Sequence, residues 1–251
     1  MLKPALVESS QQQCHPALVG YPAKHECASR AALIAVALGV ASLLGGCSTL
    51  DKKPRPTPSI SVEPETRADV WKGVATDADE ARIDRLGLAW TEALGEARRS
   101  DPRDVEAEGA LLRPRSALAR PAPTPGSYYC RLVKLGRTKA KAPAFEKFKP
   151  FFCYVEVEGD LLTIVKQTGS QRPAGRLWDD DRPDRLIFLG SLALGNGEPP
   201  IAYGDDPKRD MAGVLERIAP FKWRLVIPWP QQSTSKLDVF ELTPVAQQPQ
   251  G

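Results

Sequence analysis

The chain has 251 residues, 34 of them basic and 31 acidic, with five cysteines and two histidines. This length suffices for one hydrophobic core with linkers and helices beside it. The net charge of +3 comes without a long basic run, so the composition gives no reason to expect nucleic acid as a partner.

An uncharged apolar segment at residues 31–44 has the length of a signal-peptide core, whereas a membrane-spanning helix needs about 20 apolar residues. The sequence Leu44-Gly45-Gly46-Cys47 follows it and resembles the lipobox of bacterial lipoproteins. In those proteins the leader is cut before the cysteine, whose sulfur carries a lipid. We therefore predict a lipoprotein-type signal peptide over residues 1–46 and lipidation of Cys47. A secreted protein or a short anchor with an incidental Cys47 is the alternative.

The residue after Cys47 is Ser48. By resemblance to Gram-negative sorting signals, the absence of aspartate at this position favours the outer membrane. We expect a cell-envelope location at the periplasmic face of that membrane, with the membrane as a partner through the lipid. The leader before the apolar segment is long, which indicates a start site placed too early.

Cleavage would remove both histidines and leave 31 basic and 29 acidic residues. Catalysis by Ser-His-Asp or Cys-His groups is then excluded, as is a metal site that needs imidazole. Cys14 and Cys27 would leave with the leader, and Cys47 would carry the lipid. We predict that the remaining pair, Cys130 and Cys153, forms a disulfide in an oxidising compartment, with two reduced buried cysteines as the alternative. No cofactor and no metal are expected.

The exported part begins with residues 47–66, whose prolines and charges predict a semi-extended tether. Residues 67–125 are predicted to form a helical segment and a proline-rich connector. A helix is expected from about Thr76, with a second short helix at residues 103–112. The first helix has an apolar stripe formed by Ile83, Leu86, Trp90, Leu94 and Ala97. We expect this stripe to pack on its own domain; a partner-binding face is the alternative.

Residues 126–245 show apolar positions at a period of two, as in Phe151–Glu158, and turn signals separate the segments. We predict an α+β fold that is mainly β, in which a short N-terminal helical segment precedes a small antiparallel β-barrel or sandwich of eight to nine strands. Residues 246–251 are expected to be a disordered tail. Further strands are predicted at residues 161–167, 175–178, 185–194, 201–203, 213–218, 222–227 and 237–242.

The polar loop at residues 168–173 is the most distinctive candidate for recognition, because its side chains can bind a carboxylate or a phosphate. The candidate residues are Thr168, Ser170, Gln171 and Arg172. A structural β-turn is the alternative. Ser170 has no histidine to activate it, so only Lys166 or Lys134 remains as a weak candidate base.

Two acidic loops offer weaker candidates. Residues 179–185 contain four aspartates, but they lack the spacing and the glycine of a calcium loop, so we predict a solvated turn. Asp205, Asp210 and Glu216 are the remaining candidates for general acid or base.

Several segments of residues 71–244 resemble an uncharacterised family of Gram-negative bacterial lipoproteins, labelled domain of unknown function 4893. The segments are Ala89–Leu94, Thr168–Pro173, Phe188–Gly190, Tyr203–Asp205, Glu216–Arg217, Trp223–Val226 and Asp238–Leu242. This resemblance implies no catalytic residues. A fainter similarity, of architecture only, is to small periplasmic barrels such as metalloprotease inhibitors and lipocalin-like binders.

These patterns favour a membrane-anchored periplasmic lipoprotein that acts as a non-enzymatic binding or envelope-accessory module. Its further partner would be an envelope protein or a small ligand. The alternative is a carboxylate-dependent hydrolase that acts on an envelope polymer. Such an enzyme requires two carboxylates that converge within about 5–10 Å of each other.

Overall fold

The computed structural model describes residues 66–195 and 197–246. The expected signal peptide, Cys47 with the tether up to residue 65, and the tail from residue 247 lie outside the described residues. All the described helices and strands belong to one compact unit of the chain.

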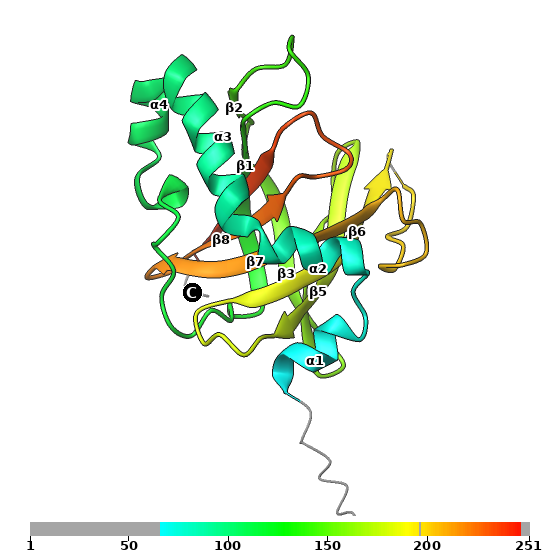
Figure 1. Ribbon diagram of the computed structural model, residues 1–251. Helices are drawn as coiled ribbons and strands as arrows, with labels where there is room; N and C mark the ends of the chain where they lie inside the picture. Colours follow the sequence, from blue (N-terminus) through cyan, green and yellow to red (C-terminus); the bar gives the residue numbers. More distant parts are fainter. Residues whose placement is uncertain (1–65, 196, 247–251) are drawn as a thin grey trace, which may run out of the picture. The chain divides into compact units, whose positions relative to one another are not determined.

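A closed antiparallel barrel forms most of this unit (Figure 1). From β3 to β9 each strand pairs with the next along the chain, β3 also pairs with β1, and β9 pairs back onto β1, which closes eight strands. The ninth strand, β2, pairs with the second half of β1, beyond its pairing with β3. The predicted fold class is confirmed, as a barrel rather than a sandwich. The strands are β1 (Gly126–Leu135), β2 (Phe145–Lys147), β3 (Phe151–Glu158), β4 (Leu161–Lys166), β5 (Gln171–Asp179), β6 (Leu186–Leu194), β7 (Asp210–Ala219), β8 (Lys222–Pro228) and β9 (Leu237–Pro244).

Three details differ from the strands predicted by the sequence. Residues 201–203 lie in the loop between β6 and β7, directly after two consecutive prolines that cannot donate ladder hydrogen bonds. Strand β5 begins at Gln171, so the second half of the polar loop at 168–173 is strand. Strand β2 has no predicted counterpart, because three residues are too few to show an alternating pattern.

The alternation of side chains places one set of residues inside the barrel. Cys130 on β1 and Cys153 on β3 both point inward and form a disulfide, with their Cα atoms 5.9 Å apart. This confirms the predicted pair. The interior also contains Tyr128, Val155, Ile164, Leu177, Leu186, Phe188, Leu192, Met211, Leu215, Trp223, Leu225, Ile227, Phe240 and Leu242.

One end of the barrel, called here the base end, carries the turns that follow β3, β5 and β7. Tyr128 and Trp223 pack edge to face inside this end, with ring centroids 6.0 Å apart. The Tyr128 hydroxyl donates to the carbonyl of Thr124 at 2.5 Å, and the Trp223 indole donates to the carbonyl of Pro121 at 2.8 Å. The proline-rich connector at residues 113–125 therefore covers the base end, and its carbonyls satisfy the polar atoms of two large interior side chains.

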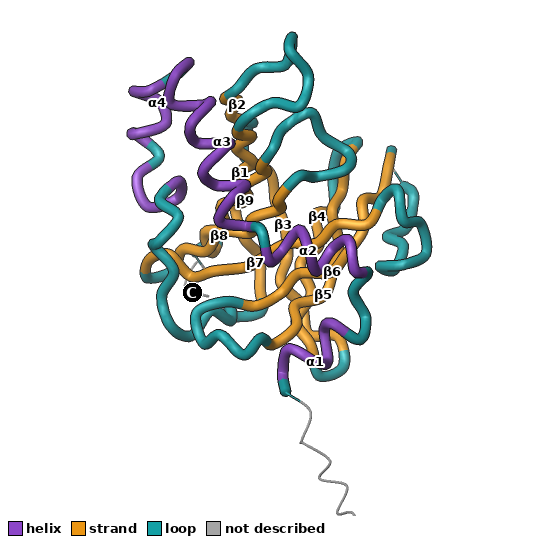
Figure 2. The backbone as a smooth tube through the Cα atoms, in the orientation of Figure 1, coloured by secondary structure: helices purple, strands orange, loops and turns teal. Residues whose placement is uncertain are grey.

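Four α-helices and one 3₁₀ turn precede the barrel strands in the described chain (Figure 2). Thr66 and Thr76 cap the first two helices through their side-chain oxygens. The helix expected from Thr76 is divided at Arg85, whose backbone leaves the helical region. The elements are α1 (Arg67–Lys72), α2 (Asp77–Asp84), α3 (Leu86–Ser100), α4 (Pro102–Ala107) and the turn η1 (Gly109–Leu112).

These helices cover the outside of the barrel in two clusters. Trp71 of α1 and Ile83 of α2 pack on outward side chains of β6 and β7. Trp90 and Leu94 of α3 pack on outward side chains of β1, β8 and β9. The apolar stripe thus packs on its own domain, as expected. Because β6 is covered on both faces, eight of its nine residues are buried and its sequence does not alternate.

Candidate functional site at the rim end of the barrel

The end opposite the base end, called here the rim end, carries the loops at residues 136–144, 167–170, 197–209 and 229–236. A cavity of about 50 Å³ lies inside the barrel at this end, and we call it the rim cavity. Apolar walls with a few convergent polar groups are typical of ligand sites. The lining residues are Leu132, Lys134, Lys166, Gln171, Pro173, Leu192, Met211, Pro230, Gln232, Ser233, Asp238 and Phe240.

Two lysines supply the positive charge of the rim cavity. Lys134 is the penultimate residue of β1 and Lys166 is the last residue of β4, so both reach the cavity from the rim. The ammonium of Lys166 lies 4.2 Å from the centroid of the Phe151 ring, and that of Lys134 lies 5.4 Å from the centroid of Phe148. Neither ammonium is in an ion pair within the described part of the chain. Burial lowers the pKa of Lys166.

Asp238 supplies the negative charge of the rim cavity, and its side chain is only 5% exposed. It accepts hydrogen bonds from the hydroxyls of Ser235 and Ser233. Burial raises the pKa of Asp238 to about 6, opposed by the charge of Lys134 and by the serine hydroxyls. Asp238 therefore changes charge close to neutral pH, which is a property common at functional sites.

The residues of the predicted polar loop separate at the rim. Gln171 lines the rim cavity, while Thr168 and Ser170 are exposed on the loop beside it. Arg172 is buried and donates to two main-chain carbonyls of the loop after β6, those of Gly195 (3.2 Å) and Glu198. Only Gln171 of the four candidates is therefore placed at the cavity, and the Arg172 guanidinium is occupied by the protein's own backbone.

The three candidates for general acid or base do not meet in one place. Asp205 accepts a hydrogen bond from a backbone amide within its own loop. Asp210 is 2% exposed and accepts from the amide of Gly204 at 3.0 Å, and burial raises its pKa. Glu216 pairs with buried Arg224 at 2.7 Å. Asp210 and Glu216 are six residues apart on β7, which corresponds to about 20 Å along a strand.

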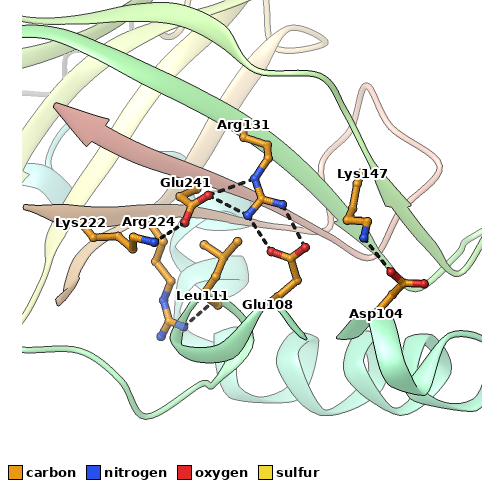
Figure 3. A network of polar contacts seen from close by, with 8 residues as sticks. All are labelled: Asp104, Glu108, Leu111, Arg131, Lys147, Lys222, Arg224 and Glu241. Atoms are coloured by element: carbon orange, nitrogen blue, oxygen red, sulfur yellow. Dashed lines mark hydrogen bonds and ion pairs between the residues drawn. The ribbon is translucent and has the colours of Figure 1, made fainter. Parts of the chain in front are cut away.

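An ionic network fastens the helical segment to the barrel wall (Figure 3). The Arg131 guanidinium on β1 donates to both oxygens of Glu108 at 2.9 and 2.6 Å, and to Glu241 of β9 at 3.0 and 2.7 Å. Glu241 also pairs with Lys222 at 2.9 Å. The hydrogen bonds that Arg131 donates to Glu108 and Glu241 hold the pKa of Arg131 above its ordinary value. Since each of these charges is matched by a partner, the network is structural.

The aspartate-rich turn between β5 and β6 is also used for packing. Asp180 is buried, pairs with Arg185 and accepts from the indole nitrogen of Trp71 at 3.1 Å. Asp184 pairs with Arg182 at 2.8 Å. The turn thereby holds α1 against the barrel, in place of the purely solvated turn that was predicted. Among the described residues, no group of three or more Asp, Glu, Cys or His side chains is placed to hold a metal ion.

A second hollow, called here the outer groove, has a volume of about 460 Å³ and lies on the outer faces of β3 to β6. Tyr203 and the residues just before it form one of its sides, and Trp178 lines it. Its positive group, Arg176, is already paired with Glu158 at 2.7 Å. Among the residues that line the outer groove, there is thus no unpaired positive charge of the kind found in the rim cavity.

The grouping of Lys134, Lys166 and Asp238 was not apparent in the sequence. The three residues span more than 100 positions of the sequence. Closure of the barrel by the pairing of β1 with β9 brings them to the same cavity. The sequence nevertheless contained an indication of this site. Each of the three charged residues occupies an inward position of its strand, where the alternating pattern predicts an apolar residue.

A family model described as "Domain of unknown function (DUF4893)" matches residues 71–242 of the chain. No curated protein and no solved structure matches the chain. Within the described residues, none of the helices combines the length and the apolar character needed to cross a membrane.

Proposed function

We propose that this chain, which belongs to the domain of unknown function family DUF4893, is a non-enzymatic binding module of the cell envelope, anchored by a lipid on Cys47. The observation that supports the binding role is the rim cavity. The connector covers the base end, while the rim end presents Lys134, Lys166 and Asp238 among apolar walls. The mouths of β-barrels are frequent sites for small ligands.

Binding is favoured over hydrolysis by the way in which the acids are used. Glu216 is neutralised by Arg224, and its position on β7 lies about 20 Å from that of Asp210. Asp205 and Asp210 are close enough to influence each other, but each already accepts a hydrogen bond from a backbone amide of the loop before β7. A glycoside hydrolase would need its two carboxylates about 5–10 Å apart. The described residues give the hydrolase alternative no support.

The lipid anchor is supported by the sequence alone, and a labelling experiment tests it. Cells that express the full chain are fed a fatty-acid analogue, and incorporation into the protein is measured. We expect label on the natural chain and on a Cys27→Ala control, because Cys27 lies in the leader, and no label on Cys47→Ala. Label on Cys47→Ala would contradict the anchor.

The binding role is tested by native mass spectrometry of the exported chain after incubation with the small-molecule fraction of an envelope extract. Gln171→Trp places a bulky ring on the rim cavity, whereas Thr168→Trp places the same ring on the neighbouring exposed loop. We expect a retained molecule on the natural chain and on Thr168→Trp but not on Gln171→Trp. No retained molecule, or equal retention by all three chains, would contradict the role.

A further inference from the structure

We propose that the rim cavity binds an anionic group, a carboxylate or a phosphate, between the ammonium groups of Lys134 and Lys166, and that protonation of Asp238 strengthens this binding. The inference rests on the proposed binding function and adds the chemical class of the ligand.

The first argument is the unmatched positive charge. Lysines elsewhere on the barrel wall have carboxylate partners, as Lys147 and Lys222 do. Lys134 and Lys166 lie over aromatic rings and have no such partner among the described residues. An ammonium held on a ring keeps its donors available, and a bound anion would accept charge-assisted hydrogen bonds from it. Gln171 lies at the same cavity and adds an amide donor. With two lysines against one aspartate, the cavity carries an excess of positive charge that a bound anion would neutralise.

The second argument is size. The rim cavity measures about 50 Å³, and below it the space among Phe151, Phe188 and Phe240 is only about 10 Å³. One buried water needs roughly 10–15 Å³ of such space, so the rim cavity accommodates a few non-hydrogen atoms. A carboxylate or phosphate group fits this limit, while a long acyl chain does not. The rest of a larger ligand would lie outside, among the loops of the rim end.

The third argument concerns the competing charge of Asp238. The charged groups that face Asp238 are Lys134 on β1, Glu146 on β2 and Lys166 on β4, and the hydroxyls of its own loop are those of Ser233 and Ser235. When Asp238 is ionised, it partly neutralises the lysines and repels an incoming anion. When it is protonated, both effects disappear. Because burial raises its pKa to about 6, the anion should bind more tightly at pH 5 than at pH 8.

The test is an amide NMR titration of the exported chain with sodium formate and, separately, with inorganic phosphate, at constant ionic strength. Formate is ionised at both pH 5 and pH 8. A change in its affinity between these two pH values therefore results from titration of groups on the protein. We expect saturable shifts at Lys134, Lys166 and Gln171, and formate binding about tenfold tighter at pH 5. Tighter binding of phosphate than of formate at pH 5 assigns a phosphate head group, and the reverse assigns a carboxylate.

Substitutions of single residues show which charged side chains affect the binding of formate. Lys166→Met and Lys134→Met keep most of the aliphatic stem and should each weaken formate binding at pH 5 by about tenfold or more, as expected for a lost charged hydrogen bond. Asp238→Asn should bind formate at pH 8 as tightly as the natural chain does at pH 5. Lys72→Met, on α1 outside the cavity, is the matched control and should bind like the natural chain. Near-ultraviolet circular dichroism verifies that each variant is folded.

In the titrations, the inference is overturned by no saturable binding of either anion, or by unchanged affinity in folded Lys134→Met and Lys166→Met. Failure of this inference can be distinguished from failure of the proposed binding function. A neutral or cationic molecule that is retained by the natural chain and lost in Gln171→Trp would contradict the anionic ligand while keeping the binding role. If the natural chain retains no molecule, both proposals are wrong.

Discussion

At the scale of single residues, buried charges fix how the helical segment lies on the barrel. The side chain of Arg224 has no exposed surface. Its guanidinium pairs with Glu216, lies over the ring of Trp90 and donates to main-chain carbonyls of Leu111 at 3.0 Å and Arg113 at 2.7 Å. One side chain thus joins β7, β8, α3 and the chain that leaves η1.

We therefore predict that Arg224→Met lowers the free energy of unfolding by about 3–5 kcal/mol, because it leaves the Glu216 carboxylate buried without a partner. Urea unfolding measures the loss. The control is Arg176→Met, whose pair with Glu158 is half exposed and should contribute only about 0–1 kcal/mol. A loss for Arg224→Met no larger than that of the control would contradict this role.

Asp238 leads to a prediction about pH. Its folded pKa of about 6 lies above the value of about 3.9 for an unfolded chain, so the folded state binds more protons between these values. Stability from this group is present at pH 4 and falls as the pH rises through 6, by about 3 kcal/mol in all. Unfolding measured from pH 4 to pH 8 should show the decline in the natural chain and a smaller one in Asp238→Asn. Asp205→Asn, on an exposed loop, should leave the decline unchanged, and equal declines in Asp238→Asn and the natural chain would exclude Asp238 as its source.

At the scale of elements, the hydrophobic period predicted most strands and the helical segment, since both depend on local pattern. The hydrophobic period did not predict the break between α2 and α3 at Arg85. This break depends on where the strands lie against which the two helices pack. Ile83 packs on β6 and β7, whereas Trp90 packs on β1, β8 and β9. One straight helix would not pack on both of these parts of the barrel. The disulfide was predictable because Cys130 and Cys153 occupy inward positions of alternating strands.

Helix α3 packs closely against the barrel at Gly136, just after β1. A Cβ atom there would lie 2.9 Å from the Cα of Ala93. Gly136 and Gly159 have nearly the same positive φ, 63° and 62°, but a Cβ at Gly159 would meet no atom within 4 Å. Gly159→Ala should cost about 1–2 kcal/mol from backbone strain alone.

We predict that Gly136→Ala costs about 1–3 kcal/mol more than Gly159→Ala, because it adds a clash with the helix backbone to the same strain. Thermal or urea unfolding of the two variants gives the difference directly. Equal losses would show that α3 does not approach the barrel as closely as the structure has it.

At the scale of the whole molecule, closure of the barrel creates the candidate site. Strand β9 pairs with β1 although more than 100 residues separate Lys134 from its partner Asp238. Local patterns carry no information about such a pairing, so the sequence left a barrel and a sandwich open and favoured the polar loop at 168–172 instead. Of the four candidate residues in that loop, Gln171 alone lines the rim cavity, while Arg172 donates to backbone carbonyls.

The central claim is that this domain binds its ligand in the rim cavity rather than on its outer wall. Amide NMR spectra of the isotope-labelled chain without its predicted leader (residues 47–251), recorded with and without the small-molecule envelope fraction, test it most directly. The account predicts perturbed signals at Lys134, Lys166, Gln171 and Asp238, with Glu156 and Arg176 of the outer groove unchanged. Perturbation confined to the outer groove would contradict it.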